Sequence, residues 1–402
     1  MRWPRPTTIV LALQLAAPAA AQEIVVWHAY RGGEKAAFEK VVQGYNARPG
    51  TKGEVTTLAV PFDAFADKIS AAVPRGKGPD VFIYAQDRLG GWIEAGNTVE
   101  PIDFFVDDAV KARFIPTTVE ALTYRGSLWG LPLNYKVIAL VYNRKMIQDP
   151  PRTTADLVAA CRKLGNKAAG TFGLAYWHEN FYYHAILMNG FGGGVFDAKG
   201  QPRVNAPENV RSLELLQRWI QKDGILPAEP STALVTSLFN EGKAAMVFSG
   251  PWFLGEIAPG IDYGVTTLPA ISELGGKPMR PWTTVEGVYI AAPSPNKEAA
   301  YEFVKYVTDV EPGRILANEG RQSPANASVY ADPKVASDPV LASFRKQVEV
   351  AVPMPNLPEM TMVWGPASTA MSSIVKGATP KAAMDRAQQQ VVQQIAGLRR
   401  RK

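Results

Sequence analysis

The chain has 402 residues, with 43 lysines and arginines against 37 aspartates and glutamates, and its formal net charge is +6 at neutral pH. So small an imbalance does not provide the basic surface by which proteins bind nucleic acids or anionic membranes, and we expect neither as a partner. A chain of this length exceeds what one hydrophobic core organises, so we expect two domains.

Residues 1–21 have the pattern of a cleavable signal peptide. Arg2 and Arg5 give a positive start, a short apolar run follows, and residues 19–21 are three alanines that form a cleavage site of the A-x-A type. The apolar run is too short and too interrupted to span a membrane. No cysteine follows the cleavage site, so we expect a free periplasmic protein rather than a lipid-anchored one.

Beyond this segment, apolar runs of strand type alternate with segments of helical period. We expect strands at 23–27, 54–58 and 81–84, with helices at 34–45 and 64–73. This alternation favours a mostly parallel sheet with helices on both faces.

The rest of the chain continues the alternation. We expect strands at 131–142, 171–175, 244–248 and 284–292, and helices at 155–164, 210–222, 233–239 and 297–308. From about Asp338 the pattern indicates helices joined by a proline-rich loop at 352–358. The GFGGG segment at 190–194 lacks the context of a dinucleotide-binding turn and is predicted to be a loop.

A charged pair follows the third predicted strand. Val81-Phe82-Ile83-Tyr84 leads into Asp87-Arg88, and Gly90-Gly91 and Trp92 come next. Ligands of parallel sheets bind beyond the carboxyl ends of the strands, and the pair lies at such an edge. Alone, it is compatible with a catalytic acid, a salt bridge that locks a turn, or a polar contact to a hydroxyl-rich ligand. We expect the two glycines to form a turn and Trp92 to be core.

Six blocks of the chain carry a family resemblance. They are IVVW (24–27), GPDVFIYAQDRLGGWIEAG (78–96), LPLNYKVIALVYNRKMI (131–147), FNEGKAAMVFSGPW (239–252), DYGVTTLPA (262–270) and MPNLPEMTMVWGPASTAM (354–371). In this order and spacing they resemble the maltose/maltodextrin-binding family of ABC-transporter periplasmic solute-binding proteins, extracellular solute-binding protein family 1. The resemblance covers nearly the whole mature chain.

The resemblance implies an α/β fold with two lobes, the type II periplasmic binding protein fold. Each lobe would hold a mostly parallel sheet flanked by helices, joined by a three-segment hinge. The expected crossings lie near 135–138, 282–286 and 331–337. The N-terminal lobe would comprise 22–135 and 286–333, and the C-terminal lobe 138–281 and 337–402. The implied function is closure around an oligosaccharide and its delivery to inner-membrane permease subunits by a monomer without a cofactor.

A sugar presents apolar C–H faces and a rim of hydroxyls, so its site needs flat aromatic rings together with charged or amide groups. The resemblance implies Asp87 and Arg88 as hydroxyl ligands and Trp252 and Trp364 as stacking rings, although a salt bridge and core tryptophans are the alternatives. The other candidate ligand-binding residues are Tyr30, Arg31, Asp67, Tyr84, Lys136, Glu179, Phe181, Tyr182, Met354 and Ser368. For Asp67, a solvated helix face is an equally good interpretation.

Four of these positions depart from the family pattern, and the first is Tyr84, which stands where the family often has a tryptophan. Lys136 occupies a position where maltose binders carry a glutamate, and Ser368 stands where an arginine is common. Phe181 replaces a tyrosine, which keeps a ring but removes a hydroxyl. Exchanging an acceptor for a donor changes which sugar hydroxyls can be matched, so trehalose or another α-linked oligosaccharide stays open beside maltose.

Two other function classes stay open. A secreted glycosidase would use carboxylates across the cleft, and Asp87 and Glu179 are expected on opposite lobes. The same fold could instead bind a polyamine, a phosphate or a metal ion.

The metal and disulfide chemistry of the chain is limited. The three histidines, His28, His178 and His184, lack the spacing of a zinc site, so we expect no metal. Cys161 is the single cysteine and cannot form an intramolecular disulfide. It lies in a helical pattern, and we expect it to be buried and inert.

Overall fold

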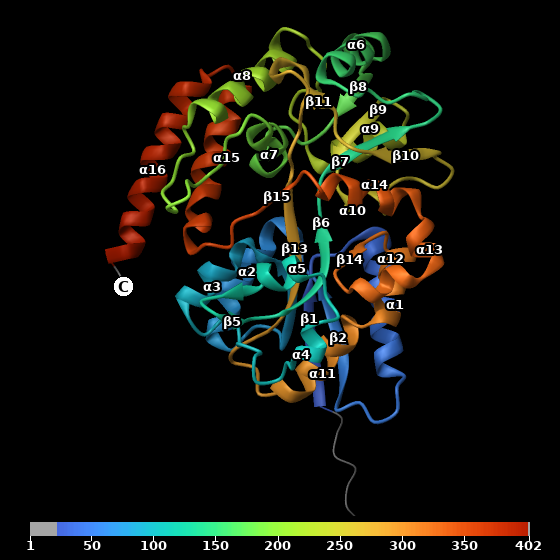
Figure 1. The fold of residues 1–402 in the computed structure, drawn as a ribbon, viewed down its shortest axis with the longest axis vertical. Coiled ribbons are helices and arrows are strands. Elements are labelled where there is room, and N and C mark those ends of the chain that lie inside the picture. Colours follow the sequence, from blue (N-terminus) through green and yellow to red (C-terminus); the bar gives the residue numbers. More distant parts are fainter. Residues whose placement is uncertain (1–21, 401–402) are drawn as a thin grey trace, which may run out of the picture.

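The computed structural model describes residues 22–400, and the expected signal peptide lies outside the described residues. The chain forms two lobes arranged along the long axis of the molecule (Figure 1). Each lobe is built on its own sheet, and helices cover both sheets. The α/β two-lobe fold class is therefore confirmed.

The larger sheet belongs to the lobe that contains the N-terminal strand. Its strands are β1 (Gln22–His28), β2 (Gly53–Ala59), β3 (Val81–Ala85), β6 (Leu131–Lys136), β13 (Trp282–Ile290), β14 (Ser323–Pro324) and β15 (Val352–Pro353). The order is β14-β6-β13-β3-β1-β2, and β15 pairs with the start of β13. β1 runs parallel to β2 and β3, which places the carboxyl ends of these three strands at one edge.

Helices flank this sheet on two sides. They are α1 (Gly32–Asn46), α2 (Phe62–Ala72), α3 (Leu89–Ala95), α4 (Asp108–Lys111), α5 (Pro116–Ala121), α11 (Lys297–Val307), α12 (Val310–Asn318) and α13 (Pro333–Ser337). Figure 1 shows α1 and α12 together on one side and α2 and α3 on the other. A short hairpin of β4 (Thr123–Tyr124) and β5 (Ser127–Leu128) completes this lobe.

The second sheet has four strands in the order β10-β7-β9-β8. They are β7 (Ala139–Asn143), β8 (Phe172–Ala175), β9 (Ala244–Ser249) and β10 (Tyr263–Thr266). Alternate residues of β7 enter different cores: Leu140 packs in one cluster, while Ala139 and Val141 pack in another. The sheet is therefore buried on both faces, as expected for an apolar run without strict alternation.

The helices of the second lobe are α6 (Thr154–Leu164), α7 (Phe181–Gly190), α8 (Pro207–Gln221), α9 (Thr232–Asn240), α10 (Pro251–Leu254), α14 (Pro339–Val348), α15 (Thr361–Val375) and α16 (Pro380–Arg400). A small hairpin joins β11 (Ala270–Ile271) to β12 (Lys277–Pro278). One core cluster lies between the sheet and α7, α8, α15 and α16, and a smaller one lies beneath α9 and α14.

The single strand expected at 131–142 is two strands. β6 ends at Lys136 in the larger sheet, and β7 begins at Ala139 in the second sheet. Val137 and Ile138 between them are almost fully buried. A continuous apolar pattern does not distinguish one long strand from two strands that lie in different sheets.

The expectation of a mostly parallel sheet in each lobe is wrong, because the strand pairing is mixed in both. In the larger sheet β13 runs antiparallel to both β3 and β6, and in the second sheet only β8 and β9 are parallel. β13 returns late in the sequence from the other lobe and enters the first sheet in the opposite direction. Pairing of this kind is not visible in the local alternation of strands and helices.

The predicted turn at Gly90-Gly91 is wrong, because both glycines lie inside helix α3. A Cβ on Gly90 would lie 2.3 Å from the backbone oxygen of Asn356, so the glycine allows α3 to pack against the proline-rich loop. Trp92 is 4% exposed and belongs to the core, as predicted. The loop predicted after α7 is present from Phe191 onward.

Cys161 is buried in α6, and burial raises the pKa of its thiol to about 12. Such a thiol is protonated at neutral pH and is a poor nucleophile. Among residues 22–400, no helix is both long and apolar enough to cross a membrane, and no group of three His, Cys, Asp or Glu side chains is arranged to hold a metal ion.

Candidate functional site

Asp87 and Arg88 lie where β3 ends. The strand is buried along its length and is followed by a short 3₁₀ helix, η2 (Gln86–Arg88), which places the pair at the carboxyl edge of the sheet. Asp87 is 5% exposed, and its Oδ2 lies 3.2 Å from Nε of Arg88. The guanidinium of Arg88 is 5.7 Å from the ring centre of Trp364, which comes from α15 of the other lobe.

The carboxyl of Asp87 is held in an unfavourable setting for a charge. Burial raises its pKa to about 6, and the positive charge of Arg88 and the side chain of Trp364 oppose this shift. A buried carboxylate needs hydrogen-bond donors to remain ionised. The side chain of Trp364 and a backbone N–H already act in this way, and donors from a bound molecule would add to them.

Tyr84 precedes this pair and forms part of an aromatic stack. Its ring lies 5.0 Å from that of Phe65 with an angle of 5° between the planes, and 5.3 Å from that of Phe62. Burial raises the pKa of Tyr84, and the charges of Asp87, Asp63 and Asp67 contribute, the last two from α2. Asp67 is exposed on that helix, and Phe62 keeps 55% of its surface exposed.

Lys136 is the centre of a buried ion triad. Its Nζ lies 2.9 Å from Oε1 of Glu34 and 3.1 Å from Oε1 of Glu286, and all three side chains are less than 15% exposed. Burial opposes the charge of Lys136, yet the two carboxylates outweigh it and raise the pKa of the lysine. Burial raises the pKa of Glu34, which the lysine charge counteracts.

Polar side chains extend this triad into a network. The hydroxyl of Tyr30 donates to Oε2 of Glu286 at 3.0 Å, and Nδ2 of Asn134 donates to the same oxygen at 3.3 Å. Nε2 of Gln322 reaches Glu34 at 3.5 Å. The ammonium of Lys136 lies 5.3 Å from the ring centre of Tyr30 and 5.9 Å from that of Trp252, so rings from both lobes adjoin the charge.

A row of aromatic rings faces these charged groups, and apart from Trp282, at the start of β13, its members belong to the second lobe. Trp282 lies at its centre, with its ring 5.7 Å from Phe181, 6.2 Å from Tyr182 and 5.9 Å from Trp364. Tyr182 lies in turn 6.2 Å from Trp252. Four of the predicted aromatic residues are thereby brought together, while Trp282 itself was not predicted.

Two polar atoms in this row are buried without a well-formed hydrogen bond to any described residue. They are Oη of Tyr182 and Nε1 of Trp364. Burial raises the pKa of Tyr182, and the charges of Asp87 and Glu286 add to the shift, so the hydroxyl lies within the field of both charged groups. Trp364 adjoins the carboxyl of Asp87 and Tyr182 adjoins Thr284, so these weakly paired buried atoms are natural further contacts for a bound ligand.

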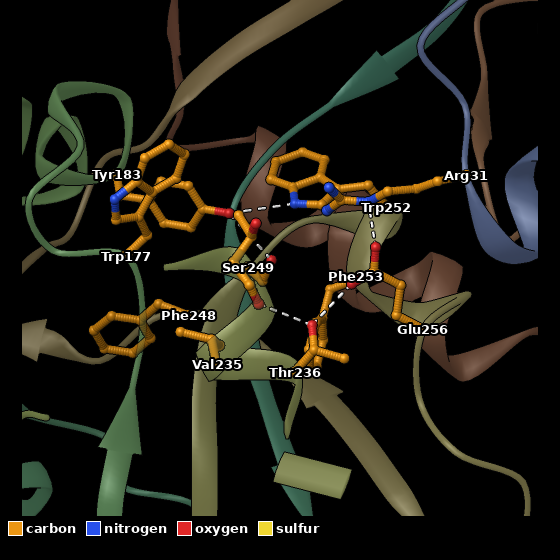
Figure 2. Close-up of a pocket in the computed structure, with 11 residues that line it drawn as sticks. Arg31, Trp177, Tyr183, Val235, Thr236, Phe248, Ser249, Trp252, Phe253 and Glu256 are labelled. Atoms are coloured by element: carbon orange, nitrogen blue, oxygen red, sulfur yellow. Dashed lines mark hydrogen bonds and ion pairs between the residues drawn. The ribbon is translucent and has the colours of Figure 1, made fainter. Parts of the chain in front are cut away.

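Trp252 lies beside a pocket of the second lobe that Figure 2 shows in close-up. Its Nε1 donates to Oη of Tyr183 at 3.3 Å, and Trp177 and Ser249 line the same pocket. Gly250 and Pro251 follow β9 and begin the short helix α10, which places the indole of Trp252 among the residues that line the pocket. Arg31 reaches the pocket from the N-terminal lobe.

Three predicted residues take more peripheral places. Glu179 lies in the turn before α7, with its side chain half-buried. Met354 is buried, and its backbone oxygen accepts a hydrogen bond of 3.2 Å from Nε2 of Gln86, which precedes Asp87. Ser368 is exposed on α15, one helical turn beyond Trp364.

Sequence reasoning missed several residues of this site: Glu34, Phe62, Glu256, Trp282 and Glu286. Of these, Glu286 carried a signal, because it is the only charged residue in the apolar strand β13. A lone charge in a buried strand requires a partner. The sequence did not indicate which side chain would supply it.

The chain was compared with known proteins. The family model of the bacterial extracellular solute-binding proteins matches residues 31–313. The chain is 32% identical to a maltotriose-binding protein of Pyrococcus abyssi, over 93% of this chain and 83% of the relative. It is 28% identical to a galactooligosaccharide-binding protein of Bacillus subtilis, over 85% of this chain and 83% of that relative.

The fold is also similar to that of a solute-binding protein of known structure. The fold superimposes on the Thermus thermophilus maltotriose-binding protein bound with maltotriose with a TM-score of 0.85. The two chains are 29% identical, and the match covers 92% of this chain and all of the other. The similarity therefore extends over both lobes.

Proposed function

The chain belongs to the bacterial extracellular solute-binding proteins, and we propose that it binds a neutral oligosaccharide between its two lobes in the periplasm and delivers it to an ABC importer. Maltose, short maltodextrins and trehalose are the candidate ligands. We also propose that the signal peptide is cleaved and that the mature protein binds its ligand as a monomer, without a cofactor.

The observation that carries the proposal is the pairing of charges in the site. Arg88 pairs with Asp87, Arg31 with Glu256, and Lys136 with two carboxylates. A charged ligand would have to displace one of these partners, whereas hydroxyl groups can add to them as further donors and acceptors. Aromatic rings adjoin each pair and would cover the C–H faces of sugar rings.

The named relatives support an oligosaccharide over a single sugar unit. Two of the three proteins described above are named for maltotriose, and the third for galactooligosaccharides. Lys136 is held by Glu34 and Glu286, so the position that carries a glutamate in maltose binders here forms part of an ion triad. We therefore place maltotriose first among the ligands to test and keep trehalose as the principal alternative.

We also propose that binding closes the lobes about a hinge near 135–138, 282–286 and 331–337. Asp87 and Glu286 belong to the first lobe and Tyr182, Trp252 and Trp364 to the second, so a ligand can contact both sets only when the lobes are closed. A ligand that binds the closed form more tightly shifts the population toward it.

Intrinsic tryptophan fluorescence provides the test, because Trp252, Trp282 and Trp364 all border the site. Addition of maltotriose is expected to shift the emission in a saturable manner, with a midpoint in the micromolar range, which corresponds to roughly 8 kcal/mol of binding free energy. Emission that stays unchanged with maltose, maltotriose and trehalose would contradict the proposal.

One observation favours a second candidate function, a secreted glycosidase. Asp87 is a buried carboxyl with a raised pKa, which is the property of a general acid in such enzymes. Against it, Asp87 is engaged by Arg88, and Glu286 by Lys136, Tyr30 and Asn134. Incubation with maltodextrin and an assay for new reducing ends separates the two functions, because a binding protein produces none.

A further inference from the structure

Two backbone segments from different lobes meet beside Trp252. One is residues 31–33, where Arg31 precedes α1 and Gly32 and Gly33 begin it, and the other is residues 255–256 after α10; together we name them the interlobe contact. The N–H of Gly33 donates to the backbone oxygen of Gly255 at 3.4 Å. A Cβ on Gly32 would lie 2.7 Å from the same oxygen. Gly32 also has a φ of +50°, so a larger residue would be disfavoured in both respects.

An ion pair between Arg31 and Glu256 lies over this contact (Figure 2). Glu256 is fixed in the second lobe: its Oε2 accepts a hydrogen bond of 2.8 Å from Thr236, and its backbone oxygen accepts one of 2.9 Å from Asn240. The side chain of Glu256 is 19% exposed, whereas that of Arg31 is 43% exposed. Arg31 therefore reaches across from the first lobe to a carboxylate that is already held in position.

The interlobe contact borders the same pocket as Trp252. Arg31, Glu256 and Trp252 all line it, together with Trp177 and Tyr183 (Figure 2). In Figure 2 the indole of Trp252 lies between Tyr183 on one side and the Arg31–Glu256 pair on the other. On that side of the indole the ion pair is followed by the glycine contact, which is formed by residues adjacent in sequence to Arg31 and Glu256.

The opposite end of the site is bordered by helix α2 rather than by a contact between the lobes. Phe62 at the start of α2 is 55% exposed and stacks on Tyr84, and Asp63 and Asp67 follow on the same helix. Figure 1 places α2 on the opposite side of the larger sheet from α1, which begins directly after Arg31. The two ends of the site therefore differ: one meets a contact between the lobes, and the other meets an exposed aromatic ring.

We infer that the interlobe contact closes one end of the ligand site, and that Arg31 and Glu256 determine which terminus of an oligosaccharide can carry further groups. The inference rests on the proposed function. A terminal sugar unit against Trp252 would stop at the contact, whereas the opposite terminus would extend toward Phe62. A longer chain at the closed end would have to separate Arg31 from Glu256 and leave a partly buried carboxylate without its cation, with Thr236 as its remaining donor, which disfavours that chain.

The test compares three ligands by calorimetry on the full mature chain: maltotriose, its 4-nitrophenyl glycoside, which is blocked at the reducing end, and a derivative with an ethylidene group at the non-reducing end. We expect one blocked ligand to bind about as well as maltotriose and the other at least about tenfold more weakly. In Arg31→Ala the ratio between the two blocked ligands should fall toward one, and Arg31→Lys should retain most of it.

The ratio of the affinities for the two blocked ligands distinguishes this inference from an effect of the substitution on lobe closure. A shifted open–closed equilibrium would change the affinity for all three ligands equally and leave this ratio unchanged. Arg144→Ala is the control, since Arg144 is exposed to a similar extent as Arg31 and forms an ion pair with Asp262 away from the site, and it should leave the ratio unchanged. Equal binding of both blocked ligands, or a ratio that persists in Arg31→Ala, would overturn the inference. Failure of maltotriose itself to bind would instead count against the proposed function.

Discussion

The ammonium of Lys136 lies 2.9 Å from the carboxylate of Glu34, although the two residues are 102 positions apart and both are buried. Lys136 is the last residue of β6, and Glu34 lies in the first turn of α1. The pair, with Glu286, therefore fixes the end of the strand from which the chain continues into the second lobe. Its energetic importance follows from burial, because removal of one partner leaves the other charge without compensation.

Lys136→Met should accordingly destabilise the protein by about 3 to 5 kcal/mol in the free energy of unfolding. In this variant the carboxylates of Glu34 and Glu286 lie close together without a cation. The loss in free energy of unfolding should therefore be smaller at low pH, because protonation removes the charge of these carboxylates. Chemical denaturation at pH 5 and pH 8 measures both effects. Lys40→Met, which breaks an exposed pair with Glu319 in the same lobe, is the control and should cost about 1 kcal/mol or less.

Trp364→Ala and Trp252→Ala should each weaken maltotriose binding by about 1 to 3 kcal/mol, since each removes an aromatic anchor that adjoins a charged group of the site. Calorimetric titration gives the dissociation constants. Trp129→Phe serves as control, because the indole of Trp129 donates to the backbone of Tyr124 and takes no part in the site. Wild-type affinity in both alanine variants would show that the aromatic row is core rather than a ligand surface.

Binding should weaken as the pH falls from 7 to 5. Burial raises the pKa of Asp87 to about 6 in the free protein. Sugar hydroxyls that donate to this carboxylate favour its ionised form, so the ligand must displace the proton that Asp87 carries below pH 6. The dissociation constant is expected to rise about tenfold between pH 7 and pH 5. Asp87→Asn should bind more weakly at pH 7 and show a flat profile, and an equally steep profile in that variant would exclude Asp87 as the source.

The raised pKa of Asp87 also makes the stability of the free protein depend on pH, but in the opposite direction from ligand binding. Stability should fall as the pH rises. The pKa of Asp87 is raised on folding from 3.8, so between these two values the folded state holds a proton that the unfolded state has lost. The stabilisation is fully present below pH 3.8 and is lost as the pH rises through about 6. Asp87→Asn should remove this part of the pH dependence, which denaturation between pH 4 and pH 7 will reveal.

Gly90→Ala should destabilise the protein by about 1 to 3 kcal/mol, even though alanine is the better helix former, because its Cβ would meet the backbone of Asn356 at 2.3 Å. The neighbouring Gly91→Ala is the matched control. Its Cβ would meet the methyl group of Thr361 at 2.7 Å, which is a side-chain contact that can adjust more easily. A thermal unfolding series compares them, and equal stability of the two variants would contradict the close approach of α3 to the proline-rich loop.

Much of the fold was predictable because its signals are local. Val81 to Tyr84 form an apolar strand followed at once by Asp87 and Arg88, and this order alone placed the charged pair at the carboxyl edge of a sheet. The helix that contains Cys161 was likewise predicted from its period. These features depend on residues within one or two turns of one another.

The remainder depends on contacts between distant segments. Glu34, Lys136 and Glu286 meet only after the chain has returned to the first sheet through β13, and no local pattern links them. Trp282 resembles an ordinary core tryptophan in sequence and becomes the centre of the aromatic row through residues of α7 and α15. The glycines of α3 looked like a turn because their packing partner is the loop at Asn356.

The central claim is that a neutral oligosaccharide binds between the lobes. Isothermal titration calorimetry of the mature protein with maltose, maltotriose, trehalose, a polyamine and inorganic phosphate tests it most directly. We expect saturable binding at one site for at least one of the sugars, with a dissociation constant in the micromolar range or below, and no heat with the charged solutes. Binding of the polyamine or phosphate together with none of the sugars would contradict it.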